Sequence, residues 1–267
     1  MVVGLIMKNN KSHLYEEKYN NQGCLMKIVE YNNNQNITVE FQDKHKARVK
    51  TQYCNFDKGS VKNPYYPVVY GVGIAGNKYK TVDENSKSIK EYTIWYHILQ
   101  RCYDEKYIKK HPAYRNVCVC EEWLYFPNFY EWLHNQPNFE KWYNGKRWAI
   151  DKDILVKGNK VYSSEMCCII PQNVNCLFLK REAERGEYPI GVRYKDNEGF
   201  IASCHNPFTD KNETIGSYST PEKAFYLGYK PYKEDIIKKV AQIEFDADNI
   251  TKECYEAMMN YEVEITD

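Results

Sequence analysis

The sequence contains no run of about 18 apolar residues, and its opening MVVGLIMKNNK lacks the length and charged start of a signal peptide. These absences argue against a membrane or secreted protein, so we expect a cytoplasmic chain with no membrane partner. No C-x-x-C pair occurs among the ten scattered cysteines, which disfavours a disulfide framework and a structural zinc site. Cys118 and Cys120 are expected to be buried thiols in a strand.

The net charge of +1 hides an asymmetry along the chain. Residues 244–267 contain eight acids and one Lys, which gives −8 + 1 = −7, so the preceding 243 residues carry +8. An excess of this size permits phosphate binding without demanding it. We interpret the acidic end as a solvated terminal helix; mimicry of DNA charge and pairing of two chains are the alternatives.

The first quarter of the chain alternates apolar and polar residues as strands do. Three such runs lie within residues 24–63, separated by Asn- and Asp-rich turns. Together with a strand near Gly4–Met7, they predict a small β-barrel of the Src-homology or Tudor kind. Such a barrel binds peptides, nucleic acid or its own neighbours.

The middle of the chain turns to helical spacing. Residues 90–103 place Trp95, Ile98, Leu99 and Cys102 on one face, and a second short helix follows near Phe126. We expect these aromatic residues to form a hydrophobic core rather than a base-stacking surface. Residues 148–178 then predict a strand, a Gly-Asn turn, a strand and a helix that opens at Pro171, which is a β-hairpin packed on a helix.

Three short strands are predicted near the C-terminus, at residues 187–194, 199–205 and 213–218. Thr220 and Pro221 begin a helix that Pro231 should break or bend. Three strands backed by a helix cannot bury both faces of the sheet, so one face is available to a partner. The fold class is therefore α+β, in four parts: 1–75, 76–183, 184–245 and 246–267.

Residues 188–228 resemble the plant ethylene-response-factor type of DNA-binding domain, which is also found fused to phage homing endonucleases. The matching residues, in order, are Gly191-Val192-Arg193, Phe200, Ala202, Ile215-Gly216-Ser217-Tyr218 and Thr220-Pro221-Glu222-Lys223-Ala224. The resemblance implies that the sheet enters the major groove of double-stranded DNA, where Arg pairs with guanine. With strand alternation, it points to four DNA contacts: Arg193, Lys195, Ser203 and His205. Phe200 replaces the Trp that is usual in this family.

Residues 92–180 resemble the HNH-type, or ββα-metal, nuclease segment of such phage proteins. The matching residues are Trp95, Arg101-Cys102-Tyr103, Val119 to Trp123, Phe126, Phe129, Asp151-Lys152-Asp153-Ile154, Tyr162-Ser163 and Asn175. In that family an acidic residue and a His or Asn hold one divalent metal, while a His on the first strand activates water. This chain has no His between His134 and His205.

The candidate catalytic residues are accordingly Asp151, Lys152, Asp153 and Asn175. On a strand, Asp151 and Asp153 would point the same way and Lys152 the other way. The two carboxylates, with Asn175 or Asn173, would hold magnesium or manganese, which prefer oxygen ligands. Lys152 is expected to be a phosphate ligand or an ion-pair partner, since its ordinary pKa of about 10.4 makes it a poor base.

Two functions follow from these residues. The first is a phage-type, metal-dependent DNA endonuclease of the homing kind, acting in the host cytoplasm. The second is a catalytically inactive DNA-binding or anti-defence protein that uses the same frame for binding alone. The absent histidine favours the second and the retained acids favour the first. In either case the N-terminal barrel or the acidic end could bind a protein partner.

Overall fold

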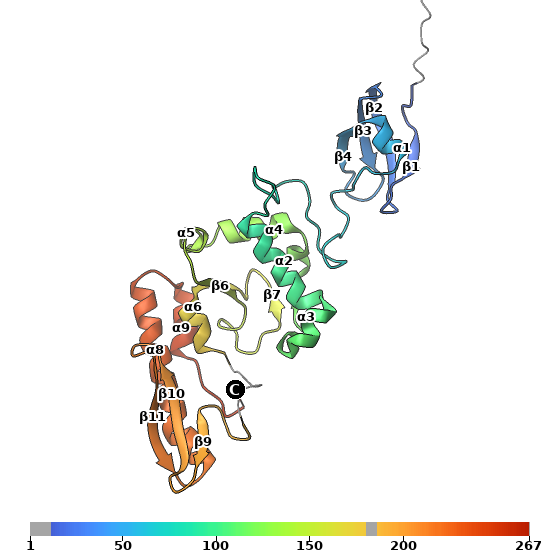
Figure 1. Cartoon of the computed structure of the whole chain (residues 1–267). Coiled ribbons are helices and arrows are strands. Elements are labelled where there is room, and N and C mark those ends of the chain that lie inside the picture. The colour runs from blue at the N-terminus through green and yellow to red at the C-terminus, as the bar shows by residue number, and fades with distance from the viewer. Residues whose placement is uncertain (1–11, 180–185, 267) are drawn as a thin grey trace, which may run out of the picture. The chain divides into compact units, whose positions relative to one another are not determined.

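The chain is α+β (Figure 1). A computed structural model describes residues 12–179 and 186–266. These residues form a four-stranded sheet, a three-stranded sheet and two two-stranded sheets. The chain divides into two compact units: residues up to Tyr107 with Glu121–Phe129, and Ile108–Cys120 with Tyr130–Asp267. None of the helices within the described ranges has the length and apolar character needed to cross a membrane.

The N-terminal sheet is an antiparallel meander in the order β1-β2-β3-β4. Its strands are β1 (Glu17–Tyr19), β2 (Leu25–Asn33), β3 (Asn36–Phe41) and β4 (Arg48–Thr51). The alternation of the sequence buries Met26, Ile28, Val39 and Phe41 on one face. The three strands predicted within residues 24–63 are thus confirmed.

The prediction of an N-terminal barrel is wrong, because this sheet is open. In the part of the chain that the structure describes, β1 and β4 are its two edges, and they are only three and four residues long. Closing a barrel needs tilted, staggered strands whose first and last members pair with each other. Here the short helix α1 (Tyr53–Asp57) adds the fully buried Phe56 to the core instead. The strand predicted near Gly4–Met7 lies outside the described residues.

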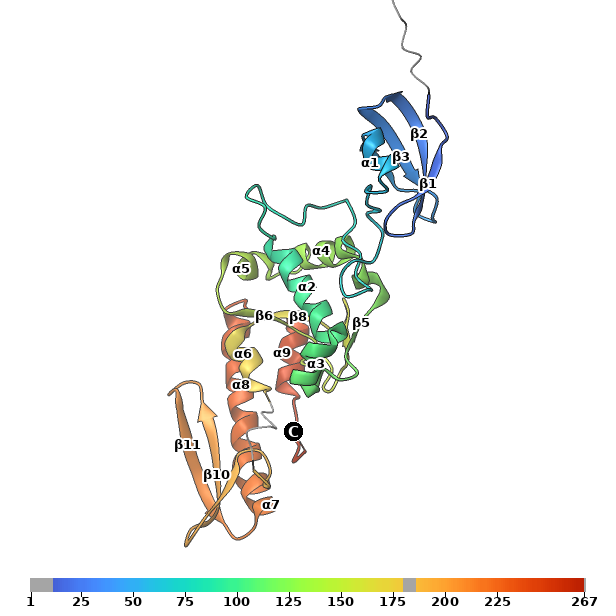
Figure 2. The same cartoon turned by 45° about the vertical axis from the view of Figure 1, so that its right-hand side comes forward.

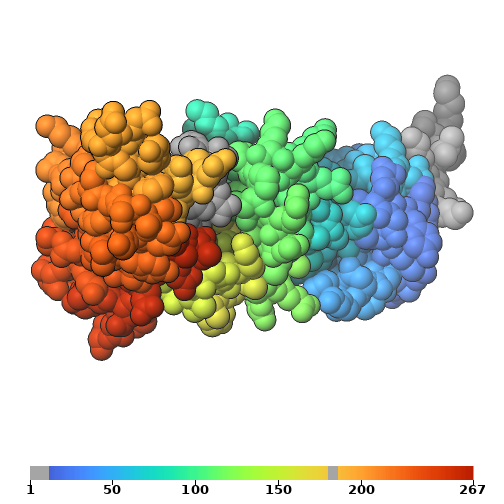
Figure 3. Space-filling model, turned by 90° about the horizontal axis from the view of Figure 1, so that it is seen from below, coloured from blue at the N-terminus to red at the C-terminus, as the bar shows by residue number. Residues whose placement is uncertain are grey.

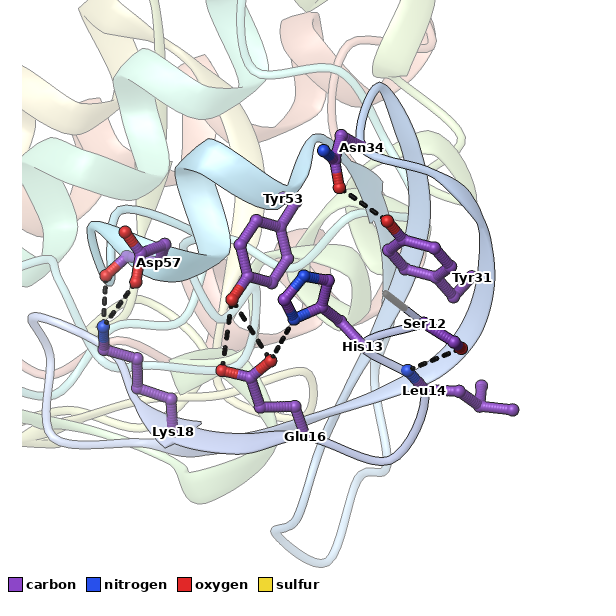
Figure 4. A network of polar contacts seen from close by, with 9 residues as sticks. All are labelled: Ser12, His13, Leu14, Glu16, Lys18, Tyr31, Asn34, Tyr53 and Asp57. Atoms are coloured by element: carbon purple, nitrogen blue, oxygen red, sulfur yellow. Dashed lines mark hydrogen bonds and ion pairs between the residues drawn. The ribbon is translucent and has the colours of Figure 1, made fainter. Parts of the chain in front are cut away.

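Polar contacts join α1 to the segment around β1 (Figure 4). The Tyr53 hydroxyl donates to both carboxylate oxygens of Glu16, at 3.2 and 3.3 Å, and His13 Nδ1 lies 2.8 Å from the same carboxylate. Lys18 Nζ lies 3.2 Å from the Asp57 carboxylate. Burial, followed by the charge of Glu16, raises the pKa of Tyr53. The network therefore holds helix and strand together with the Tyr53 phenol protonated.

Aromatic residues form the core between α2 (Lys90–Tyr103), η2 (Glu121–Leu124) and the start of α4 (Phe126–His134). Trp95, Trp123, Phe126 and Phe129 are at most 2% exposed. Trp95 Nε1 donates to the Trp123 carbonyl at 2.7 Å, which satisfies the buried indole. The predicted helix at 90–103 is confirmed, and so is the assignment of its aromatic face to a core.

The connection after α2 contains α3 (Glu105–Lys110) and η1 (Pro112–Tyr114). In the second unit, β5 (Cys118–Val119) pairs in parallel with β7 (Val161–Tyr162), and β6 (Trp148–Asp151) pairs antiparallel with β8 (Cys168–Pro171). The helices of this region are α5 (Phe139–Asn144) and α6 (Gln172–Leu177). Cys118 is exposed and Cys120 half-buried, so the expectation of two buried thiols is wrong, although Cys118 does lie in a strand.

The predicted hairpin across Gly158 does not form. Gly158 has the expected positive φ of 78°, but β6 takes β8 as its partner. The pair nearest the turn, Asp151 and Cys168, encloses 168 − 151 − 1 = 16 residues, which is too many for a tight hairpin. This register pairs Ala149 with Ile170 and Ile150 with Ile169, so apolar side chains meet across the ladder. The helix predicted at Pro171 is confirmed, because Pro171 is the N-cap of α6.

The C-terminal sheet consists of β9 (Val192–Lys195), β10 (Gly199–Asn206) and β11 (Lys211–Tyr218), with β10 in the centre. One side of it is lined by α7 (Pro221–Lys223), the π-helix η4 (Ala224–Tyr229) and α8 (Lys230–Asp246) (Figure 2). The Thr220 hydroxyl caps the helix by accepting from Lys223 N at 3.2 Å. The predicted strands and cap are confirmed.

Pro231 does not break the helix. It lies in the first turn of α8, directly after η4. A proline lacks the N–H that an α-helical hydrogen bond requires, and the π-helix η4, a rare element, changes the hydrogen-bond spacing directly before it. The helical path therefore continues from Pro221 to Asp246 without interruption.

The acidic end of the chain packs into the core of the second unit and is not a solvated appendage. Its helix α9 (Lys252–Met259) is capped by Thr251, whose hydroxyl accepts from Cys254 N at 3.3 Å. Cys254, Met258 and Val263 join the core that also contains α6 and α8. Figure 3 shows the red C-terminal end of the chain against a yellow segment of the second unit. Lys157 Nζ donates to the Glu262 carbonyl at 2.8 Å.

Candidate nucleic-acid interface

Strand register places the predicted DNA contacts on one face of the C-terminal sheet. Arg193 pairs with Ile201, which in turn pairs with Ser217, so these three side chains share a face. Ser203 pairs with Thr214 and His205 with Asn212. Because alternate residues of β9 and β10 share a face, Arg193, Lys195, Ser203 and His205 all lie on it. We call this face, which also contains Asn212, Thr214, Ser217 and the buried Ile201, the polar face.

A bulge interrupts the pairing of β10 with β11 next to this face. Ala202 pairs with Gly216 but Ser203 pairs with Thr214, so Ile215 is the extra residue of β11. A bulge increases the local twist of a strand and aims neighbouring side chains in a new direction. It therefore sets the angle between the Arg193 row and the His205 row of the polar face.

The opposite face is apolar and fixed against the helices. Ala202 and Cys204 are buried in one core with Phe225 of η4 and Ile237 of α8. Gly191, with φ of 74°, lies under the Tyr229 ring, where a Cβ would come within 1.9 Å of Cδ2. This packing holds β9 and β10 in a defined position, which a surface that reads a ligand requires.

Phe200 belongs to the apolar face. It pairs with Tyr194 and Tyr218, its ring centroid lies 5.2 Å from that of Tyr194, and it packs against the buried core. The ring is thus on the side away from Arg193. The strand register therefore does not support a base or sugar contact by the Phe200 ring.

The charges of the polar face are accessible. Arg193 is exposed. Lys195 pairs with Glu198, and His205 Nε2 lies 3.7 Å from Asp210, with about half of each basic side chain exposed. Exposed ion pairs of this kind contribute at most about 1 kcal/mol, so a phosphate can displace the acid. The face therefore presents the charged groups of Arg193 and Lys195, together with the half-exposed His205 ring, to a polyanion.

Asp151, the first of the predicted metal ligands, ends β6. Its Oδ1 accepts hydrogen bonds from Asp153 N at 2.7 Å and Ile154 N at 2.9 Å, and these bonds turn the chain away from the strand. Burial raises the pKa of this carboxyl, while the two N–H donors act in the opposite direction. The Asp151 carboxyl therefore fixes the backbone turn that follows β6.

Lys152 and Asp153 do not continue the strand, which departs from the predicted alternation. Lys152 is buried, and its ammonium binds the Asp153 carboxylate and the Asn159 carbonyl, the latter at 3.1 Å. The predicted ion-pair character of Lys152 is thus present. The sequence pattern indicated Asn159 only as a turn residue, whereas its side-chain amide donates to the backbone carbonyls of Lys152 and Val161 at 2.8 and 2.7 Å. Its position after Gly158, in a loop, was the available signal.

Within the described residues, neither asparagine of α6 forms a hydrogen bond with the Asp151, Lys152 and Asp153 cluster. Asn173 Nδ2 donates to Glu244 Oε1 at 2.6 Å, and the backbone carbonyl of Asn175 accepts from Phe178 N at 3.3 Å. Across residues 12–179 and 186–266, no three His, Cys, Asp or Glu side chains are placed to share a metal ion. One predicted carboxylate ligand accepts from backbone N–H groups and the other binds an ammonium, so both already have partners within the protein.

The ring of His134 packs between two aromatic side chains. Its ring centroid lies 4.0 Å from those of both Tyr130 and Phe139. His97 is exposed on α2, beside Tyr96.

Comparisons with protein-family models, curated proteins and solved structures give no match for this chain. The chemistry of the polar face and of the Asp151 region therefore rests on their own residues.

Proposed function

We propose that this protein binds double-stranded DNA through the polar face of its C-terminal sheet. The observation that carries the proposal is the convergence of Arg193, Lys195, Ser203 and His205 on one face, opposite a packed apolar face. Arg193 would pair with guanine in the major groove, where a bidentate contact discriminates by about 1–3 kcal/mol. Lys195 and His205 would contact phosphates and set the register along the duplex.

The test begins with selection of bound duplexes from a randomised library, followed by fluorescence anisotropy. Arg193→Ala should weaken binding to the selected sequence about 10- to 100-fold and binding to unrelated DNA much less. Arg48→Ala is the matched control, since it removes an exposed arginine from the N-terminal sheet. Equal loss on all sequences would reduce Arg193 to a phosphate contact. Wild-type protein that binds no duplex even at low salt would refute the proposal.

The second candidate is a metal-dependent DNA endonuclease of the HNH type. It is favoured by the order of elements around Asp151, in which an antiparallel pair, β6 and β8, is followed directly by α6. Its test is nicking of supercoiled DNA with magnesium, manganese or EDTA. Metal-dependent nicking that disappears in Asp151→Ala would establish cutting; duplex binding without nicking supports the binding protein, which would then suit an anti-defence role.

A further inference from the structure

Lys152 is buried to an extent that is unusual for a lysine. It follows β6 directly and is 7% exposed, whereas lysine side chains are almost never buried without a partner. A buried ammonium has lost its water and must find oxygen atoms or electron-rich faces in the protein. The groups that surround this ammonium therefore indicate which kind of cation the region binds.

Three partners of different chemistry surround the Lys152 ammonium. The Asp153 carboxylate supplies a negative charge, the Asn159 carbonyl oxygen lies at 3.1 Å, and the centroid of the Tyr162 ring lies at 5.8 Å. Carboxylate and carbonyl oxygens are the ligands of hard cations, and an aromatic face within about 6 Å attracts an ammonium. The environment is thus that of a cation site whose cation is a side chain.

Hydrogen bonds at both ends of the loop between β6 and β7 hold it around the Lys152 ammonium. Asn159 accepts from the ammonium through its carbonyl and returns hydrogen bonds from its amide to the carbonyls of Lys152 and Val161. Asp151 fixes the start of the same loop by accepting from two backbone N–H groups. Residues 151–162 are therefore ordered around the ammonium, which lies between the end of β6 and the start of β7.

We propose that Lys152 is a tethered cation that takes the structural place of a metal ion in this region. Its ammonium neutralises Asp153 and draws Asn159 and Tyr162 together, so the loop needs no divalent ion to fold. A divalent ion at the Asp153 carboxylate would have to displace the ammonium and would be repelled by it. The inference is independent of DNA binding, because it concerns which cation orders the loop.

The test combines metal titration with chemical rescue. Wild-type protein should show no saturable manganese binding by calorimetry, and the same Tm in magnesium, manganese and EDTA. Lys152→Ala should lower the Tm by about 5–10 °C, since it leaves a carboxylate and a carbonyl without their partner. n-Propylammonium, which supplies the missing ammonium and three carbons, should restore part of that loss saturably at constant ionic strength. Lys160→Ala, which alters an exposed lysine of the same loop, is the control and should show neither effect.

Two results would overturn the proposal. One is saturable manganese binding to the wild-type protein that Asp151→Asn abolishes, because the region would then hold a metal with Lys152 in place. The other is a Lys152→Ala variant that propylammonium does not stabilise beyond its effect on Lys160→Ala. If Lys152→Ala does not fold in buffer, the recovery of refolded protein from urea becomes the readout, and refolding that propylammonium leaves unchanged counts against the proposal.

Discussion

At the scale of single residues, the Asp151 carboxyl experiences opposing effects. Burial disfavours its charge, and two backbone N–H groups hydrogen-bond to its Oδ1. Burial dominates, so the folded-state pKa is above the ordinary value. A raised pKa of an acid stabilises the fold fully below the unfolded pKa of about 3.8, and this stabilisation is lost as the pH rises through the folded-state pKa.

Asp151→Asn separates the two effects, because the amide keeps the acceptor oxygen and removes the charge. We expect its free energy of unfolding to exceed that of the wild type at pH 7, with the difference shrinking as the pH falls toward 4. Asp151→Ala should be about 1–3 kcal/mol less stable at both pH values, since two buried donors lose their acceptor. Urea unfolding at a series of pH values measures this, and a difference that does not change with pH would contradict the pKa direction.

The register between β10 and β11 decides which residues belong to the polar face. Asn212, Thr214 and Ser217 were not singled out by sequence, yet the pairing of β11 with β10 places them beside His205, Ser203 and Ile201. Alternation along one strand tells which residues share a face of that strand. Only the register between strands tells which residues of two strands share a face, because a shift of one residue reverses every side chain.

At the scale of elements, the contact between β9 and η4 depends on a glycine. Gly191 has φ of 74°, and an added Cβ would lie 1.9 Å from Tyr229 Cδ2. Gly158 has a similar φ of 78° but nothing within 4 Å of such a Cβ. Both positions therefore require a positive φ, but only at Gly191 would an added Cβ collide with a neighbouring side chain.

We expect Gly191→Ala to lower the free energy of unfolding by about 3 kcal/mol or more, because the ring or the strand must move. Gly158→Ala should cost about 1–2 kcal/mol, which is the strain of a left-handed conformation alone. Urea unfolding of both variants gives the comparison. Equal losses would mean that Tyr229 moves aside freely and that the Gly191 contact does not position β9.

At the scale of the whole molecule, the acidic end contributes a layer of core. Met258 and Cys254 are fully buried, and α9 packs on α8. Its acids, among them Glu253 and Glu256, are exposed on the opposite side of the helix. The amphipathic helix therefore carries its charge outward, while its apolar side completes the second unit.

Deletion of residues 250–267 should lower the Tm by about 5 °C or more, since several buried apolar side chains lose their contacts. The matched control is the double variant Glu253→Gln and Glu256→Gln, which removes two negative charges and should change the Tm by less than about 2 °C. Differential scanning calorimetry distinguishes the two. A deletion variant with the Tm of the full chain would restore the interpretation of this segment as a solvated appendage.

Local sequence patterns by themselves determined several of the helices and strands of this protein. The helical spacing of Trp95, Ile98 and Leu99 predicted α2 with its bounds, and the Thr220-Pro221 pair predicted the start of the C-terminal helix. Alternation predicted β2 to β4 and β9 to β11. These features depend on interactions within a few residues, such as a cap, a repeat of 3.6 or a repeat of two, and therefore can be recognised in the sequence.

Tertiary structure alone decided the pairings and the burial. The sequence around Gly158 is a good turn, yet β6 pairs with β8, because the apolar residues of β8 match those of β6 better than the two-residue β7 does. The open N-terminal sheet, the burial of α9 and the enclosure of Lys152 likewise depend on partners distant in sequence or on a loop path without a repeating pattern. Such contacts depend on the competition among all apolar and charged groups of the chain, which no single segment encodes.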